Sequence, residues 1–334
     1  MKKSSAIFLI LASFIGAGFA TGKELFIFYA RFGFVGVLNI VLTALLLYIV
    51  IKYYLNNHNC CCVFENESNI FCKIVKISLT FCYFIVCSAL FASINELCFS
   101  LTIKTEMCVG VLIATLILVL ILSFGDVKNL SKISSVLVPI IILFYVVVCV
   151  CGIIKGNFKI NNYNYSNNIL ISVCSGINYV GINTVLSLML FKNIGINCKQ
   201  NKRVAIGCAI IFGLLVFLGV YALMCSSINI VISEMPLLVL ATSVSKVLGW
   251  GYIVGMWFAI LTSILTIVYT IKCNLKSIIN NNILLTVFAI VPCFVLSFVG
   301  FGNLIEYLYP VIGAIGVAYF MVFKIKNSKT IVKI

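Results

Sequence analysis

Long apolar runs alternate with short polar connections along the whole chain. A run of about 20 apolar residues is the length that a helix needs to cross the hydrocarbon core of a bilayer. The pattern therefore predicts about ten membrane-spanning helices, and it predicts one or two short helices at the surface for residues 227–247. The predicted spans are residues 6–29, 34–55, 74–99, 107–124, 133–154, 169–191, 203–226, 249–272, 283–300 and 304–323.

The composition supports this interpretation. Hydrophobic residues make up 63% of the chain and charged residues 9%, with a mean hydropathy of +1.23. These values are typical of a polytopic membrane protein in contact with a lipid bilayer, and we expect one domain over residues 1–334. The net charge of +15 does not indicate a nucleic-acid partner, because the lysines are scattered between the apolar runs.

The positive charges indicate the orientation of the chain in the membrane. With the N-terminus inside and the predicted spans alternating, 17 of the 23 lysines and arginines face the cytoplasm and 5 face outward, while Lys23 lies within the membrane. Cytoplasmic loops carry such an excess of positive charge. The pattern therefore predicts that both termini are cytoplasmic.

The middle of the first span is unusual for a membrane helix. It contains three glycines, Gly16, Gly18 and Gly22, and the charged pair Lys23 and Glu24. Glycine weakens a helix, and a charge at membrane depth costs about 2.5–3.5 kcal/mol even on the gentler insertion scales. A broken helix at this depth is tolerated where its free backbone groups line a cavity or a ligand. We therefore expect a discontinuous helix that forms half of a transport site.

The sixth span has a similar central segment, from Ser175 to Tyr179, followed by Gly181. One interpretation is that Gly176 and Gly181 are positions where neighbouring helices pack closely, as is common in membranes. The alternative is a second break. Because this span follows the first by five, two breaks would indicate an inverted five-plus-five repeat, with one repeat over about residues 5–155 and the other over about 165–326.

The segment Gly16–Glu24 reads Gly-Ala-Gly-Phe-Ala-Thr-Gly-Lys-Glu. It resembles the first-helix signature of the bacterial YkvI-type membrane proteins, usually Gly-Ala-Gly-Phe-Ala-Ser-Gly-Gln-Glu, from which Thr21 and Lys23 depart. That family is placed near the amino acid–polyamine–organocation superfamily. The resemblance implies an all-α protein of the bacterial cytoplasmic membrane with the LeuT-like inverted repeat, in which helices 1 and 6 are discontinuous.

The eighth span contains Ala259, Thr262 and Ser263 in the Ala-x-x-Thr-Ser form of the sodium site of LeuT-like symporters. The resemblance implies that the two hydroxyl groups and the Ala259 carbonyl bind Na⁺ together with the carbonyls of Ala12 and Ile15. The alternative is a Thr-Ser pair that hydrogen-bonds to its own helical turn. Apart from Na⁺ as a possible coupling ion, we expect no metal or cofactor.

A break in the first helix would also suit a small zwitterion. Backbone N–H groups at the break favour a carboxylate, and Asn178 with the Tyr179 hydroxyl would suit an ammonium group. The predicted substrate site comprises Gly16, Ala17, Gly18, Phe19, Ser88, Phe91, Ser175, Gly176, Asn178 and Tyr179.

Four charges near the outer side need partners: Lys23, Glu24, Glu96 and Glu306. LeuT-like carriers close the outer gate with an ion pair between helices one and ten, a role that Lys23 and Glu306 would fill here. Alternatively, Glu24 or Glu96 pairs with Lys23 or carries a coupled proton. A third possibility is that Lys23 extends toward the surface and Glu24 complements a helix N-terminus.

Other functional classes fit less well. The single histidine, His58, lies in a polar loop and the single aspartate, Asp126, lies at a helix end, which argues against an intramembrane Ser-His or aspartyl enzyme. We predict a secondary active transporter of a small organic solute, favouring an amino acid, coupled to Na⁺ or H⁺ by alternating access. A channel or a sensor on the same fold is the alternative, and the sequence leaves the oligomeric state open.

Overall fold

The computed structural model describes residues 3–57, 70–99, 105–124, 127–161, 163, 165, 166, 168–197, 201–276 and 278–331. These residues form helices and short connections, with no strand among them. His58 and Asp126 lie outside the described residues. The helices are α1 (Lys3–Phe14), α2 (Ala17–Thr21), α3 (Lys23–Phe28), η1 (Ala30–Phe32), α4 (Gly33–Asn56), α5 (Ile70–Phe99), α6 (Thr105–Leu122), α7 (Val127–Lys155), α8 (Ile169–Asn197), α9 (Asn201–Met224), α10 (Ile228–Val231), α11 (Pro236–Val244), α12 (Lys246–Leu275), α13 (Asn282–Leu296), η3 (Ser297–Val299), α14 (Phe301–Asn303), η4 (Leu304–Leu308) and α15 (Tyr309–Ile331).

The all-helical membrane architecture is confirmed. Within the described residues, 7 helical segments are long and apolar enough to cross a membrane. Every predicted span contains helix, but the apolar parts described for α6 and α7 are shorter, at Val109–Leu122 and Pro139–Lys155. Large apolar side chains such as Leu38, Val41 and Leu45 are exposed along α4, as expected for a surface that contacts lipid. A layout of ten crossings therefore stays a prediction.

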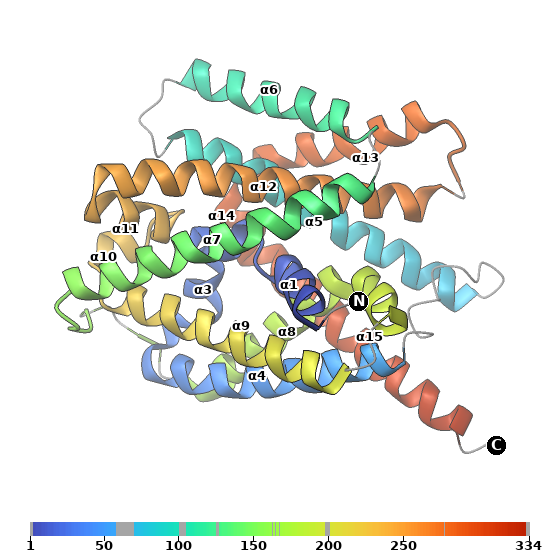
Figure 1. Ribbon diagram of the computed structural model, residues 1–334, viewed down its shortest axis with the longest axis horizontal. Helices are drawn as coiled ribbons and strands as arrows, with labels where there is room; N and C mark the ends of the chain where they lie inside the picture. Colours follow the sequence, from blue (N-terminus) through green and yellow to red (C-terminus); the bar gives the residue numbers. More distant parts are fainter. Residues whose placement is uncertain are drawn as a thin grey trace.

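The first span is broken, as predicted. Helix α1 ends at Phe14, and Gly16 has an extended backbone (φ −86°, ψ −173°) before α2 begins. A second interruption separates α2 from α3 at Gly22, whose φ of +83° lies in the left-handed region that favours glycine. The segment is buried in the middle of the helical assembly (Figure 1).

The predicted break in the sixth span is wrong. Helix α8 runs without interruption from Ile169 to Asn197. The two glycines serve close packing instead: a β-carbon on Gly176 would lie 2.5 Å from Asn39 Nδ2, and one on Gly181 would lie 2.8 Å from the Gly313 carbonyl carbon. The polar side chains of this helix also bond to their own turns, since Asn183 donates to the Tyr179 carbonyl at 2.8 Å. Such bonds satisfy polar groups in a membrane helix without unwinding it.

Residues 227–247 form two short helices, α10 and α11, as predicted. Their placement at the surface is wrong for α11, because Leu237, Leu238 and Leu240 are almost fully buried. Helix α11 packs against α12, α7 and α2 (Figure 1). The apolar run that begins at Leu237 explains this burial, and it places α11 against the broken helix.

Most of the remaining long helices form two groups around the broken helix (Figure 1). Helices α4, α8, α9 and α15 pack together on one side, and α8 and α9 both contact α1. Helices α5, α7, α12 and α13 form the other group, in which α12 contacts both α5 and α7. The break in the first span therefore lies between two packed groups of helices.

Candidate functional site: a buried carboxylate at the helix break

Glu24 lies at the start of α3, directly after the left-handed Gly22 and Lys23. Its residue exposure is only 7%. The carboxylate folds back against α2, because a β-carbon on Gly18 would lie 2.6 Å from Glu24 Cδ. Gly18 thus makes room for an acidic side chain at the break.

Helix α8 supplies the hydrogen-bond donor for this carboxylate. The Tyr179 hydroxyl donates to Glu24 Oε2 at 3.2 Å, and Tyr179 is fully buried. Tyr29 lies edge-on to the Tyr179 ring with centroids 5.4 Å apart, and its own hydroxyl donates to Thr43 Oγ1 at 3.1 Å. A membrane-buried acid is therefore held by a phenol whose ring is itself fixed by a neighbouring tyrosine.

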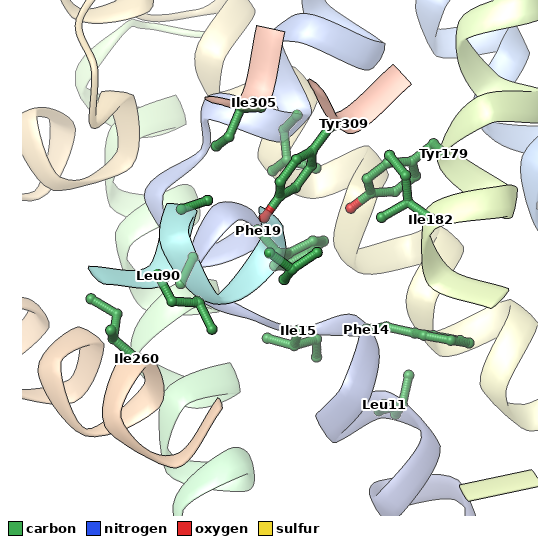
Figure 2. Packing of buried hydrophobic residues seen from close by; sticks show 14 of the residues in the cluster. Leu11, Phe14, Ile15, Phe19, Leu90, Tyr179, Ile182, Ile260, Ile305 and Tyr309 are labelled. Carbon is green, nitrogen blue, oxygen red and sulfur yellow. The ribbon is translucent and has the colours of Figure 1, made fainter. Parts of the chain in front are cut away.

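Aromatic rings surround this pair. Phe28 lies 5.1 Å from the Tyr179 ring and Phe212 stacks on it at 6.1 Å, measured between centroids. Phe19 joins the cluster through Phe212, at 5.6 Å. In Figure 2 the hydroxyl groups of Tyr179 and Tyr309 point toward the same region beside Phe19. We call Glu24 with Phe19, Phe28, Tyr29, Tyr179, Phe212 and Tyr309 the Glu24 site.

Part of the predicted substrate set meets at the Glu24 site. Gly18, Phe19 and Tyr179 lie there, Gly16 forms the extended residue of the break, and Ala17 begins α2. The other predicted members make contacts away from the Glu24 site. On α8, Gly176 packs on Asn39, the Asn178 carbonyl packs on Gly313, and Ser175 is buried. On α5, Ser88 donates to the Phe84 carbonyl and Phe91 packs edge-on to Phe294.

Among the predicted sodium ligands, Thr262 shows the alternative to ion binding, a hydroxyl group that hydrogen-bonds to its own helical turn. Its hydroxyl donates to the carbonyls of Phe258 and Ala259, both at 3.0 Å, so it bonds to its own helical turn. The Ile15 backbone nitrogen donates to Leu11 at 2.8 Å, which continues α1 by one residue. Ile15 and Ala259 are buried, whereas Ala12 and Ser263 are partly exposed.

The predicted outer pair of Lys23 with Glu306 is not formed in this structure, and a gate role for these charges stays a prediction. Lys23 Nζ pairs with Glu234 Oε2 at 3.4 Å and donates to the Ser233 carbonyl at 3.4 Å, while Glu306 is exposed on η4. The Glu234 carboxylate rests on Gly302, where a β-carbon would lie 2.6 Å from Oε1. The connection between α10 and α11 thus joins α3 to α14, the start of the tenth predicted span.

Glu96 lies near the Lys23–Glu234 pair. It is partly buried near the end of α5 and lies close enough to Lys23 and Glu234 to interact electrostatically with both. Glu234 is not among the predicted site residues, because residues 227–247 were expected to form short helices at the surface. The available signal was that Glu234 is the only acidic residue in that segment.

The Lys23–Glu234 pair predicts a measurable effect on local opening. Changing Glu234→Gln removes the pair, and we expect amide hydrogen exchange in residues 23–28 to accelerate by up to about fivefold, since a partly exposed ion pair contributes at most about 1 kcal/mol. Mass spectrometry of the protein in nanodiscs measures this rate. The control is Glu306→Gln, which should leave the exchange rate unchanged. Acceleration in Glu306→Gln but not in Glu234→Gln would restore Glu306 as the partner of Lys23.

Comparison with known proteins supports the similarity suggested by residues 16–24. No family model matches the chain. Over 327 residues the chain is 22% identical to a protein of Bacillus subtilis (strain 168) described as "Uncharacterized membrane protein YkvI", covering 95% of this chain and 93% of that protein. The similarity to a YkvI membrane protein thus extends over nearly the whole chain rather than the first-helix signature alone.

Proposed function

We propose that the protein is a secondary transporter that moves a small organic solute across the bacterial cytoplasmic membrane by alternating access. The observation that carries the proposal is a broken helix with a buried carboxylate, Glu24, at the centre of a bundle of membrane-length helices. Backbone breaks and ionisable groups at such depth are costly, and in membrane proteins they mark solute or ion pathways. The proposal assigns no catalytic chemistry to the chain.

The packing order of the helices supports an inverted repeat. Helix α1 packs on α8, α4 packs on α9, and α5 packs on α12. In each case a predicted span contacts the span five positions later. Helices near a two-fold axis contact their own counterparts in the other repeat. Two related halves would therefore produce this packing order, one over about residues 5–155 and the other over about 165–326. The LeuT-like part of the proposal rests on this packing, since only the first half has a broken leading helix.

The geometry also suggests how access would alternate. Helices α2 and α3 are short segments set off by Gly16 and Gly22, so their orientation relative to α1 depends on two glycine backbones. Leu237 of α11 covers Gly22, and the Lys23–Glu234 pair closes the outer end. Opening toward the outside would separate this pair.

We also propose that both termini face the cytoplasm, because cytoplasmic loops carry an excess of positive charge.

Uptake by the purified protein in liposomes tests the proposal. A panel of radiolabelled amino acids and amines is offered with an imposed Na⁺ or pH gradient. We expect uptake that saturates with solute concentration and requires a gradient. Flux that rises linearly with concentration, without dependence on a gradient other than that of the solute, would indicate a channel and contradict the proposal.

Sodium coupling has its own test in the double variant Thr262→Ala with Ser263→Ala. Because the Thr262 hydroxyl bonds to its own helix, we expect uptake and its dependence on Na⁺ to stay within about twofold of the unmodified protein. Thr266→Ala is the matched control, since Thr266 makes a similar bond to its own turn at 2.8 Å and is exposed. Loss of Na⁺ dependence in the double variant alone would establish the sodium site.

A further inference from the structure

The break in the first helix already contains a carboxylate. In the sequence analysis, this break was expected to bind the carboxylate of a zwitterionic substrate. The structure places Glu24 there instead, with its carboxyl group against Gly18 and a hydrogen bond from Tyr179. A substrate carboxylate at the same position would meet a like charge in an environment of low dielectric, where repulsion is strong. The chemistry of the Glu24 site therefore suits a cation.

The protein supplies no cation of its own to this carboxylate within the described part of the chain. The neighbouring Lys23 reaches Glu234 rather than Glu24. Arg31 is partly exposed and interacts electrostatically with Glu306 and Tyr163. An ionised carboxylate that is buried without a cation costs several kcal/mol. With its carboxyl group buried in this way, Glu24 is therefore expected to carry a proton.

The groups around Glu24 suit an organic cation when that proton leaves. The titratable side chains that interact with the carboxyl group are phenols: Tyr179 from α8, Tyr29 after α3 and Tyr309 at the start of α15. Phenols stay neutral near pH 7. Phe212 of α9 stacks on the Tyr179 ring, with the centroids 6.1 Å apart. Aromatic faces attract ammonium groups, and the attraction grows when water is excluded.

We propose that Glu24 is a single site occupied alternately by a proton and by the ammonium group of a small organic amine. When the amine binds, the O–H bond of the Glu24 carboxyl breaks and the proton passes to water. The resulting carboxylate accepts hydrogen bonds from the ammonium group, and the Tyr179 hydroxyl continues to donate to Oε2. One positive charge replaces another, so the site stays neutral overall. This inference rests on the proposed transport function for movement across the membrane, where it implies exchange of an amine for a proton.

Proton release on binding tests the inference without transport. Methylammonium, ethylammonium or putrescine is added to the purified protein in weakly buffered detergent solution with a pH-indicator dye, and leucine is added as a zwitterionic comparison. We expect at least one of the three cations to release about one proton per bound molecule, the exchange that competition for one carboxyl group requires. Leucine should release none. Binding of the cations without proton release, or release from none of them, would overturn the inference.

Variants assign the released proton to one residue. Glu24→Gln keeps the size and a hydrogen-bond acceptor but cannot ionise, so proton release should disappear and cation binding should weaken at least about tenfold. Glu24→Asp retains the acid and should restore release at lower affinity, which shows that loss in Glu24→Gln is not a folding defect. The control Glu306→Gln changes an exposed carboxylate and should behave as the unmodified protein. Undiminished release from Glu24→Gln would overturn the assignment.

Uptake measurements keep the two proposals separate. Saturable, gradient-driven uptake that is unchanged in Glu24→Gln would support a transporter and overturn the exchange at Glu24. Proton release that depends on Glu24, without saturable uptake of any of the same amines, would support the cation site and contradict the transport function.

Discussion

Replacing Gly181 by alanine is expected to lower the melting temperature of the purified protein, although alanine is the better helix former. In a helix interior this substitution normally stabilises by about 1 kcal/mol. Here the new β-carbon would lie 2.8 Å from the Gly313 carbonyl carbon and 3.0 Å from its Cα. Gly316 makes the reciprocal contact, since a β-carbon there would lie 2.6 Å from the Gly181 carbonyl carbon. Backbone atoms cannot rotate away, so α8 and α15 would have to separate.

The expected loss is about 1–3 kcal/mol, the usual cost of overpacking a well-packed interior. Thermal unfolding in one detergent, followed by intrinsic fluorescence, measures it. Gly110→Ala on α6 is the matched control, because nothing lies within 4 Å of its added β-carbon. That variant should melt at the same temperature as the unmodified protein or higher. A Gly181→Ala protein that is as stable as Gly110→Ala would contradict the close approach of the two helices.

This pair of helices also shows why one part of the fold was not predictable from sequence. A glycine in an apolar run marks either a break or a close approach by another helix. Gly16 and Gly22 belong to the first kind, because their backbones leave the helical region. Gly176 and Gly181 belong to the second. The difference depends on Asn39 and Gly313, residues far away along the chain that local patterns do not reveal.

The candidate site was predictable in its parts but not in its connections. The spans, the break at Gly16 and the unusual position of Glu24 follow from apolar periodicity and the cost of a charge at membrane depth. That Tyr179 donates to Glu24 depends on how α8 packs against α3. Similarly, Glu234 is the partner of Lys23 because burial of α11 brings the connection before it over the start of α3. Tertiary packing determined both pairings.

Changing Gly18→Ala should remove the function of the Glu24 site while leaving the fold intact. The added β-carbon would collide with the Glu24 carboxyl group, which is the far end of a flexible side chain rather than backbone. The side chain can turn away at little cost in stability, so we expect a melting temperature close to that of the unmodified protein. Because the displaced carboxyl group no longer accepts from Tyr179, we expect amine-induced proton release to fall at least about tenfold.

Infrared spectroscopy of the carboxyl group distinguishes displacement of Glu24 from a general loss of activity. In the unmodified protein, the carbonyl band of a protonated buried acid should be present and should disappear in Glu24→Gln. Gly18→Ala should shift this band as the hydrogen bond to Tyr179 is lost. Gly16→Ala adds the same methyl group two residues earlier, where nothing lies within 4 Å, and should leave the band in place. A Gly18→Ala protein that retains both the unshifted band and full proton release would show that binding does not depend on the position of the Glu24 carboxyl group. That result would contradict the exchange of a proton for an amine at Glu24.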